Sequence, residues 1–171
     1  MEHLKKHIRS IPDFPKRGIL FRDITTLLKE KKPFKEVIDI FYKKYKNKKI
    51  DAIVAAEARG FIFGGVLAHK LDCGFIPVRK KGKLPAETHE ATYDLEYGKD
   101  ALYMHKDAVN SKHKILIVDD LLATGGTAKA MCDLVEKAGG VVVGIAFMIE
   151  LEELKGRKKL SKYDIFSLIK Y

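Results

Sequence analysis

The sequence predicts an α/β domain in which helices flank a mostly parallel central sheet. Two stretches carry this prediction, because in each an apolar run stops at a short polar turn and an apolar helical stretch follows. The first comprises a strand at 50–56, a turn and a helix at 61–71, and the second a strand at 115–118, a turn and a helix at 127–138. Continuous β-branched runs of this length are typical of parallel strands that are buried on both faces.

The other elements follow from periodicity and from breaking residues. Leu4 and Ile8 recur on one side of residues 1–10, which predicts a short amphipathic helix. Two prolines and a glycine then make residues 11–18 an ordered or extended loop, and Pro33 suits the first turn of an amphipathic helix. Further strands are expected at 73–79, 100–105, 141–150 and 165–169, with a short charged connector at 151–160.

Length and composition favour one compact domain, which we expect to span residues 1–171. Cys73 and Cys132 lack the spacing of a zinc site or a redox pair, so we interpret both as buried apolar residues. No signal-like segment is recognisable, and the longest apolar run, at 141–149, is far too short to span a bilayer. We therefore expect a soluble, cytoplasmic protein without a membrane partner.

The net charge of +10, from 33 Lys and Arg against 23 Asp and Glu, suits either nucleic acid or a small polyanion. Lysines cluster within 43–49 and at 158–159, where helix ends and turns are expected. They lack the interleaved aromatic residues of a single-strand binding surface. We interpret most of them as solvated surface and disfavour nucleic-acid binding.

The turn after the strand at 115–118 combines two carboxylates with small and hydroxyl-bearing residues. Helix N-termini at this edge of an α/β sheet present unpaired N–H groups and a positive dipole to a ligand. The residues that suit an anion there are Thr124, Gly125, Gly126 and Thr127. Asp119 and Asp120 need a different partner, for which sugar hydroxyls or a metal ion are the candidates. Together these features indicate a phosphorylated sugar.

Two competing interpretations of this turn are weaker. A P-loop NTPase also has an apolar strand that ends in Asp-Asp, but the closest match to its phosphate-binding motif, at 60–65, lacks the lysine. An isolated Gly-Gly would favour a tight turn with solvated aspartates. Five matching features in one stretch argue against that interpretation.

Residues 118–127 resemble the phosphoribosyl-pyrophosphate loop of type I phosphoribosyltransferases, and the form of the loop is similar to that of the adenine-specific branch. The resemblance implies the type I phosphoribosyltransferase fold, a Rossmann-like sheet with an N-terminal base-binding segment and a flexible lid hairpin. It also implies that the residues from Ala123 to Thr127 hold the 5-phosphate. Asp119 and Asp120 would face the ribose hydroxyls and any Mg²⁺ bound nearby.

The turn at 57–60 places an arginine beside small residues at a helix N-terminus, which suits a second phosphate group. The alternative is that Arg59 and Glu57 form an ordinary surface pair. The resemblance identifies this turn as the pyrophosphate loop and implies contacts from Ala58, Arg59 and Gly60, with Arg59 also acting in catalysis. It further implies a non-proline cis peptide bond, which we expect at Ala58–Arg59.

Phe21 and Arg22 place an aromatic ring beside a planar cation, a pair that is able to stack on a flat heterocycle. From composition alone, Phe21 is better interpreted as an ordinary core residue. Residues 12–15 and 21–24, however, resemble the base-binding segment of the adenine-specific enzymes. The resemblance implies that Phe21 stacks on adenine and that the backbone of Leu20 and Arg22 reads its edge.

The lysine-rich stretch at 80–85 is either a solvated hairpin tip or a segment that closes over a diphosphate. Together with Arg79 it resembles one end of the lid of the adenine-specific enzymes. The resemblance implies diphosphate contacts from Lys80 and Lys83.

Residues 95–98 resemble the other end of that lid. The resemblance implies that Glu96 is the acid/base partner of the purine ring and that Tyr97 helps to cover the reacting centre. Residues 86–92 depart from the family pattern, and we interpret His89 as a solvated histidine.

The resemblance implies transfer of the 5-phosphoribosyl group from phosphoribosyl pyrophosphate to N9 of adenine, giving AMP and diphosphate, by a Mg²⁺-dependent homodimer. Two alternatives stay open. Another type I phosphoribosyltransferase, acting on xanthine, hypoxanthine-guanine or orotate, would keep the phosphate loops but replace the signatures at 21–22 and 95–97. A regulatory protein that senses phosphoribosyl pyrophosphate on nucleic acid would explain the basic charge, but no DNA-binding domain fits into 171 residues.

Overall fold

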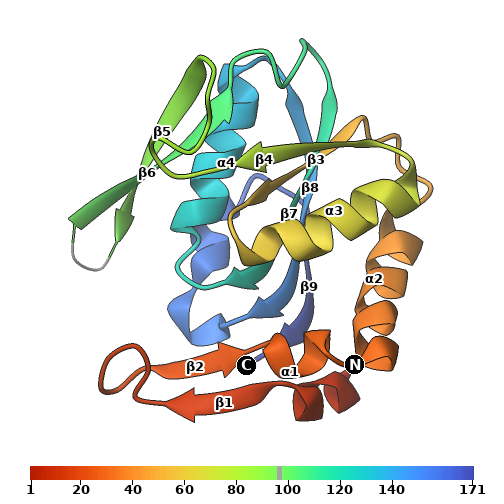
Figure 1. Ribbon diagram of the computed structural model, residues 1–171, viewed down its shortest axis with the longest axis vertical. Helices are drawn as coiled ribbons and strands as arrows, with labels where there is room; N and C mark the ends of the chain where they lie inside the picture. The colour runs from red at the N-terminus through yellow and green to blue at the C-terminus, as the bar shows by residue number, and fades with distance from the viewer. Residues whose placement is uncertain (96–97) are drawn as a thin grey trace.

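The computed structural model describes residues 1–95 and 98–171, and its centre is a five-stranded sheet (Figure 1). The strands lie in the order β4–β3–β7–β8–β9, and every neighbouring pair is parallel. In that order their bounds are Gly74–Val78, Ala52–Ala56, Lys114–Leu122, Val141–Glu150 and Ile165–Lys170. The α/β class and the mostly parallel sheet are confirmed.

Helices cover both faces of this sheet. Helix α3 (Arg59–Leu71) follows β3, α4 (Gly126–Lys137) follows β7, and α2 (Lys31–Tyr45) packs beside α3 (Figure 1). Among the described residues, no helix combines the length and the apolar character needed to cross a bilayer.

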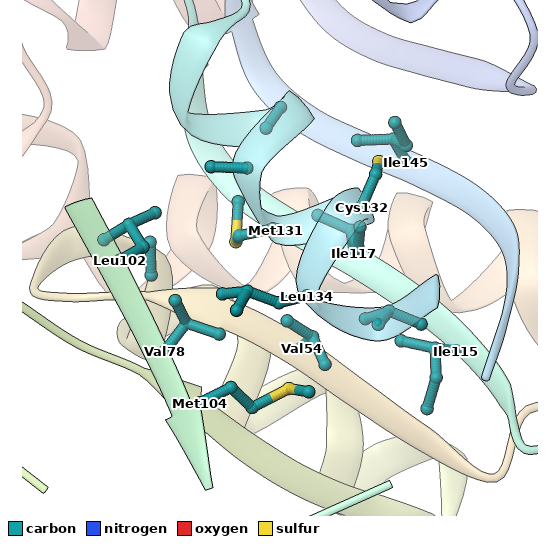
Figure 2. Close-up of a cluster of buried hydrophobic side chains, with 14 of the residues drawn as sticks. Val54, Val78, Leu102, Met104, Ile115, Ile117, Met131, Cys132, Leu134 and Ile145 are labelled. Carbon is teal, nitrogen blue, oxygen red and sulfur yellow. The ribbon is translucent and has the colours of Figure 1, made fainter. Parts of the chain in front are cut away.

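Side chains alternate between two cores along β7. Ile115 and Ile117 belong to the cluster on the α4 side, where Figure 2 shows them with Leu134. Leu116 and Val118 belong to the other cluster, together with residues of α2 and α3. Because both faces of the strand are buried, the sequence has a continuous apolar run instead of a period of two. The interior of β7 is therefore packed on both faces up to the point where its carboxylates begin.

The N-terminal segment differs from the prediction of one helix over 1–10. A 3₁₀ helix, η1 (Glu2–His7), ends before β1 (Arg9–Pro12), which pairs antiparallel with β2 (Leu20–Asp23). Arg9 and Ser10 pair with residues of β2 that lie more than ten positions along the chain, and this pairing replaces helical hydrogen bonds. Pro12 has no N–H to continue a helix. A one-turn helix, α1 (Thr25–Leu28), follows β2.

A second antiparallel hairpin is formed by β5 (Thr88–Leu95) and β6 (Gly98–His105), and it projects from the body of the molecule (Figure 1). Strand β6 begins two residues before the predicted start at 100, because its pairing with β5 continues to the hairpin tip. The hairpin connects to the central sheet through a bridge between Arg79 and Tyr103. After β8, the connector predicted at 151–160 forms two 3₁₀ turns, η2 (Glu152–Leu154) and η3 (Gly156–Leu160).

Candidate active site

The two turns singled out in the sequence lie side by side. Strands β3 and β7 are parallel neighbours, so their carboxyl ends meet at the same edge of the sheet. A cleft of about 240 Å³ opens there, lined by residues 56–59, 119–121, 123 and 127. A smaller hollow of about 60 Å³ adjoins it and is lined by residues 121–128. The structure thus brings the predicted pyrophosphate and 5-phosphate turns together.

The 5-phosphate turn ends at the N-terminus of α4. Gly125 is the N-cap residue with φ +81°, a left-handed conformation that favours glycine, and its carbonyl accepts from the Lys129 N–H at 3.0 Å. Gly126 is the first helical residue, and Thr127 lies within the first turn. This geometry directs unpaired backbone N–H groups and the positive end of the helix dipole into the hollow, as an anion site requires.

Asp119 and Asp120 are both buried at the carboxyl end of β7. The Asp120 backbone N–H donates to Asp119 Oδ1 at 3.0 Å, and Arg59 Nε lies 2.8 Å from Asp120 Oδ2. Burial, and then the charge of Asp120, raises the pKa of Asp119 well above its ordinary value. Burial also raises the pKa of Asp120, while Arg59 opposes that shift. A further cation in the cleft would stabilise the doubly ionised pair.

These two carboxylates fit a Mg²⁺ ion that is shared with a ligand. Magnesium is typically held by one or two carboxylates, substrate phosphate oxygens and waters, and Asp119 and Asp120 both line the open cleft. Within 1–95 and 98–171, no cluster of three or more His, Cys, Asp or Glu side chains is placed to hold a metal ion. The described residues therefore offer a partial ligand set that a phosphorylated substrate would complete.

Arg59 links the carboxylates to the predicted base-binding segment. Its guanidinium carbon lies 5.3 Å from the centroid of the Phe21 ring, within the range of a cation–π contact. Phe14 packs edge-on against the same ring, with centroids 5.1 Å apart and planes at 72°. One arginine thus contacts both the aromatic ring expected to stack on the base and a carboxylate expected to face the ribose.

Glu57 contacts Lys80 and Arg79, instead of forming the surface pair with Arg59 that was the alternative interpretation of the sequence. Its carboxylate accepts from the Lys80 backbone N–H at 2.6 Å and lies 3.2 Å from Arg79 Nη2. The hydrogen bond from Lys80, followed by the side-chain hydrogen bond from Arg79, outweighs desolvation and lowers the pKa of Glu57. Glu57 therefore connects the pyrophosphate turn to the start of the predicted lid, whereas Arg59 pairs with Asp120.

The non-proline cis peptide bond of this turn lies one position earlier than expected. It joins Glu57 to Ala58, so the prediction of Ala58–Arg59 is wrong. Ala58 is already the N-cap residue of α3, with φ −105° and ψ −33°, and Arg59 is helical. The chain must therefore change direction before Ala58. Gly60 follows in the first turn, and a Cβ atom added there would lie 2.7 Å from Asp119 Oδ1.

The residues predicted to bind the base lie on β2, whose first residue, Leu20, is 47% exposed. Phe21 is partly buried, which agrees with neither a fully buried core residue nor a free surface ring. The Arg22 guanidinium stacks on the Tyr171 ring at 3.7 Å from its centroid and donates to Ser10 Oγ at 2.5 Å. The Arg22 side chain is therefore engaged by Tyr171 and Ser10, and the role of its backbone in reading the base stays a prediction.

Lys80 is engaged with the hairpin instead of projecting freely. Its Nζ lies 2.9 Å from Asp100 Oδ2, and the Tyr93 hydroxyl donates to the same oxygen at 3.1 Å. Burial, and then the bond to Asp100, raises the pKa of Tyr93, whereas its contact with Thr127 lowers it. The lid is therefore connected to both phosphate turns, and sequence reasoning missed Tyr93 and Asp100 because only the strand pairing brings them opposite one another.

Of the other residues predicted to lie in the lid, the structure describes Lys83 and His89. Lys83 is exposed, and its carbonyl accepts from Arg79 Nη1 at 3.2 Å. His89 is only partly exposed, opposite Met104 in the hairpin, instead of fully solvated. The catalytic assignments of Glu96 and Tyr97 lie outside the described residues.

Comparison with known proteins agrees with this geometry. The family model of the phosphoribosyl transferase domain matches residues 23–170. An adenine phosphoribosyltransferase of Brachyspira hyodysenteriae is 60% identical over 168 residues, which cover 98% of this chain and 99% of the relative. The crystal structure of the enzyme of that name from Thermoanaerobacter pseudethanolicus is 56% identical and superposes with a TM-score of 0.97, over 99% of each chain.

A third similar structure carries ligands. It is the adenine phosphoribosyltransferase of Saccharomyces cerevisiae in complex with an imino-altritol bisphosphate and adenine, which is 42% identical. It superposes with a TM-score of 0.92 and covers 98% of this chain and 97% of its own. With a family model matched over most of its length, and relatives that align from end to end, the chain belongs to the phosphoribosyltransferase family and, within it, to the adenine phosphoribosyltransferases.

Proposed function

We propose that this protein transfers the 5-phosphoribosyl group of phosphoribosyl pyrophosphate to N9 of adenine, giving AMP and diphosphate, as an enzyme of purine salvage. One observation carries the proposal: Arg59 contacts both Asp120, beside the N-terminus of α4, and Phe21 on the base-binding strand. A sugar phosphate and a flat base bound at these two places would meet at this arginine. The names of the relatives support adenine as that base.

Each part of the cleft has a role in this reaction. The turn from Ala123 to Thr127 holds the 5-phosphate at the N-terminus of α4. Asp119 and Asp120 face the ribose hydroxyls. Mg²⁺, held by these carboxylates and the substrate, would help to neutralise the leaving diphosphate.

The pyrophosphate turn acts on the leaving group. Departure of diphosphate leaves positive charge on the sugar, so the catalytic effect comes chiefly from stabilising the leaving anion and excluding water. Arg59 and the backbone of Ala58 and Gly60 lie where the diphosphate would be held, and Lys80 and Lys83 join them when the lid closes. Phe21 stacks on adenine, with its edge read by the backbone of Leu20 and Arg22.

Glu96 manages the proton of the purine in this proposal, and Tyr97 covers the reacting centre. Glu96→Gln should therefore slow single-turnover chemistry by about 10²-fold or more while leaving the Kd for adenine nearly unchanged. Glu87→Gln, at an exposed position before the same hairpin, is the matched control. Wild-type single-turnover rates in the Glu96 variant would remove this residue from the mechanism.

We also propose a homodimer in the cytoplasm, in line with the family resemblance. Ile62 and Val66, one turn apart on α3, are exposed apolar side chains that a partner subunit would cover. Sedimentation equilibrium at micromolar concentration measures the mass directly, and a monomer would contradict the dimer.

The proposed activity is tested with adenine, hypoxanthine, guanine, xanthine and orotate, each supplied with phosphoribosyl pyrophosphate and Mg²⁺. Nucleotide and diphosphate are both quantified. AMP formed from adenine alone supports the reaction and the base assignment. Turnover of another base instead would discard the roles of Phe21 and Glu96, and no turnover by the folded protein would refute the proposal.

A further inference from the structure

The connector turn η3 touches the 5-phosphate turn through backbone atoms. A Cβ atom added at Gly125 would lie 2.6 Å from the Gly156 carbonyl oxygen. One added at Gly156 would overlap the Ala123 carbonyl oxygen and lie 3.0 Å from the Gly125 nitrogen. Neither residue has room for a side chain, so the two backbones are in direct contact where α4 begins. The position of Gly156 therefore limits where the phosphate-binding N–H groups can lie.

Arg157, the residue next to this contact, holds η3 against the sheet. Its Nε lies 2.6 Å from Glu150 Oε1, and its Nη2 donates to Glu150 Oε2 at 2.8 Å, a bidentate pair. The guanidinium also donates to the Ile165 carbonyl and to Ser167 Oγ, both at 3.3 Å. Glu150 is only 4% exposed and ends β8, so Arg157 is held by two adjacent strands of the central sheet.

The connector is fixed on both sides of this arginine. Before it, the Leu151 N–H donates to the Leu122 carbonyl at 2.9 Å, which joins the connector to the end of β7. After it, Leu160 is fully buried in the same cluster as Leu122. Between these two points, Glu152 accepts from Lys170 Nζ at 2.7 Å, and Arg157 supplies the side-chain contacts next to Gly156 itself.

We propose that Arg157 is a positioning residue for the phosphorylated substrate, acting through Gly156 on the turn from Ala123 to Thr127. The inference rests on the proposed function in so far as that turn holds the 5-phosphate. Arg157 has no need to touch the ligand, because its donors are directed at Glu150 and β9. Misplacement of a binding group by about 1 Å is able to cost about 10²-fold in rate, so a small shift of Gly156 has a measurable effect.

The test compares Arg157→Gln with Lys158→Gln, measuring ribose 5-phosphate binding by calorimetry and the KM of each substrate. Lys158 is the exposed neighbour in the same turn, so its variant loses the same charge without disturbing Glu150. We expect Arg157→Gln to weaken ribose 5-phosphate binding and raise the KM for phosphoribosyl pyrophosphate by about tenfold, with the KM for adenine unchanged. Arg157→Lys keeps the charge but loses the bidentate pair with Glu150, so its ribose 5-phosphate affinity should lie between those of the wild type and Arg157→Gln.

Equal ribose 5-phosphate affinity in Arg157→Gln and Lys158→Gln, both folded by circular dichroism, would overturn the inference. So would a parallel rise in both KM values, since that indicates a general structural effect. Gly156→Ala should show the larger loss; if it fails to fold, the Arg157 pair still decides. Because ribose 5-phosphate lacks a base, a protein that binds it but leaves adenine unused would refute the proposed function without affecting this comparison. No binding of ribose 5-phosphate by the wild type would refute the inference itself.

Discussion

Three glycines in α3 allow one substitution to be compared at three positions of a single helix. Gly60, Gly64 and Gly65 all lie between Arg59 and Leu71, so replacement by alanine brings a similar change in helix propensity at each. Their surroundings differ. A Cβ atom at Gly60 would lie 2.7 Å from Asp119 Oδ1, one at Gly64 would lie 2.9 Å from Phe75 Cε2, and one at Gly65 would meet no atom within 4 Å.

Gly60→Ala is expected to lower activity by displacing a carboxylate that lines the cleft. The Asp119 carboxylate is buried, and Oδ1 accepts from the Asp120 N–H, so it cannot move away without losing that hydrogen bond. The Val118 carbonyl, 3.4 Å from the added atom, limits movement of α3 in the same direction. We expect Asp119 to be displaced by several tenths of an ångström and kcat/KM for phosphoribosyl pyrophosphate to fall by about 10²-fold. The free energy of unfolding should fall by about 1–3 kcal/mol from overpacking.

The two other variants separate this effect from stability. Gly65→Ala should stabilise the protein by about 1 kcal/mol, which is about 2–4 °C in Tm for a chain of this size, with normal kinetics. Gly64→Ala should destabilise the protein through the Phe75 ring, again with normal kinetics at a temperature where it is folded. Steady-state kinetics and urea unfolding of the three variants give the comparison. If Gly60→Ala kept the kinetics of Gly65→Ala, the argument that this glycine makes room for Asp119 would be refuted.

Two further predictions concern charged pairs. Side-chain hydrogen bonds from Arg9 and Thr25 hold the pKa of Asp23 at about 2, below the ordinary value of 3.8. The contribution of ionised Asp23 to the free energy of unfolding is therefore complete above about pH 4 and is lost as the pH falls toward 2. Since Arg9 is largely exposed, we expect Asp23→Asn to cost about 1–2 kcal/mol at pH 7 and much less at pH 2, measured by urea unfolding; an equal cost at both values would contradict this linkage. Asp100→Asn should release Lys80 and tighten diphosphate binding by up to about fivefold in calorimetry, the equivalent of a pair worth at most about 1 kcal/mol. Unchanged affinity, equal to that of the exposed control Asp107→Asn, would show that Lys80 is not a diphosphate ligand.

The sequence was most informative where structure is local. The apolar run of β7 and the helical spacing after Thr127 predicted strand, turn and helix, because neighbouring residues determine periodicity. Strand β1 was missed because Arg9 and Ser10 read as a helix end until β2 pairs with them. Such pairing depends on residues more than ten positions away, which no local pattern records.

In the candidate site, too, the sequence predicted residues of local motifs but not residues that only long-range contacts bring there. The turn residues Asp119 and Gly125 were recognised from a motif, and the structure places both at the cleft or its adjoining hollow. Gly156 was assigned no role from the sequence, since one glycine in a charged connector is ordinary, and its contact with Gly125 is visible only in the structure. The sequence also did not indicate that Asp100 pairs with Lys80, because the folding of the hairpin brings these two residues together.

The ring of Tyr171 has a practical consequence for how this protein is handled. It lies under the Arg22 guanidinium, with Lys5 Nζ 5.0 Å from its centroid, while its backbone N–H donates to the Glu150 carbonyl. A purification tag fused directly after Tyr171 would add mass and charge beside β2, the strand proposed to read the base. Met1, by contrast, is 55% exposed. Substrate-specificity measurements are therefore best made with an N-terminal tag, or with none.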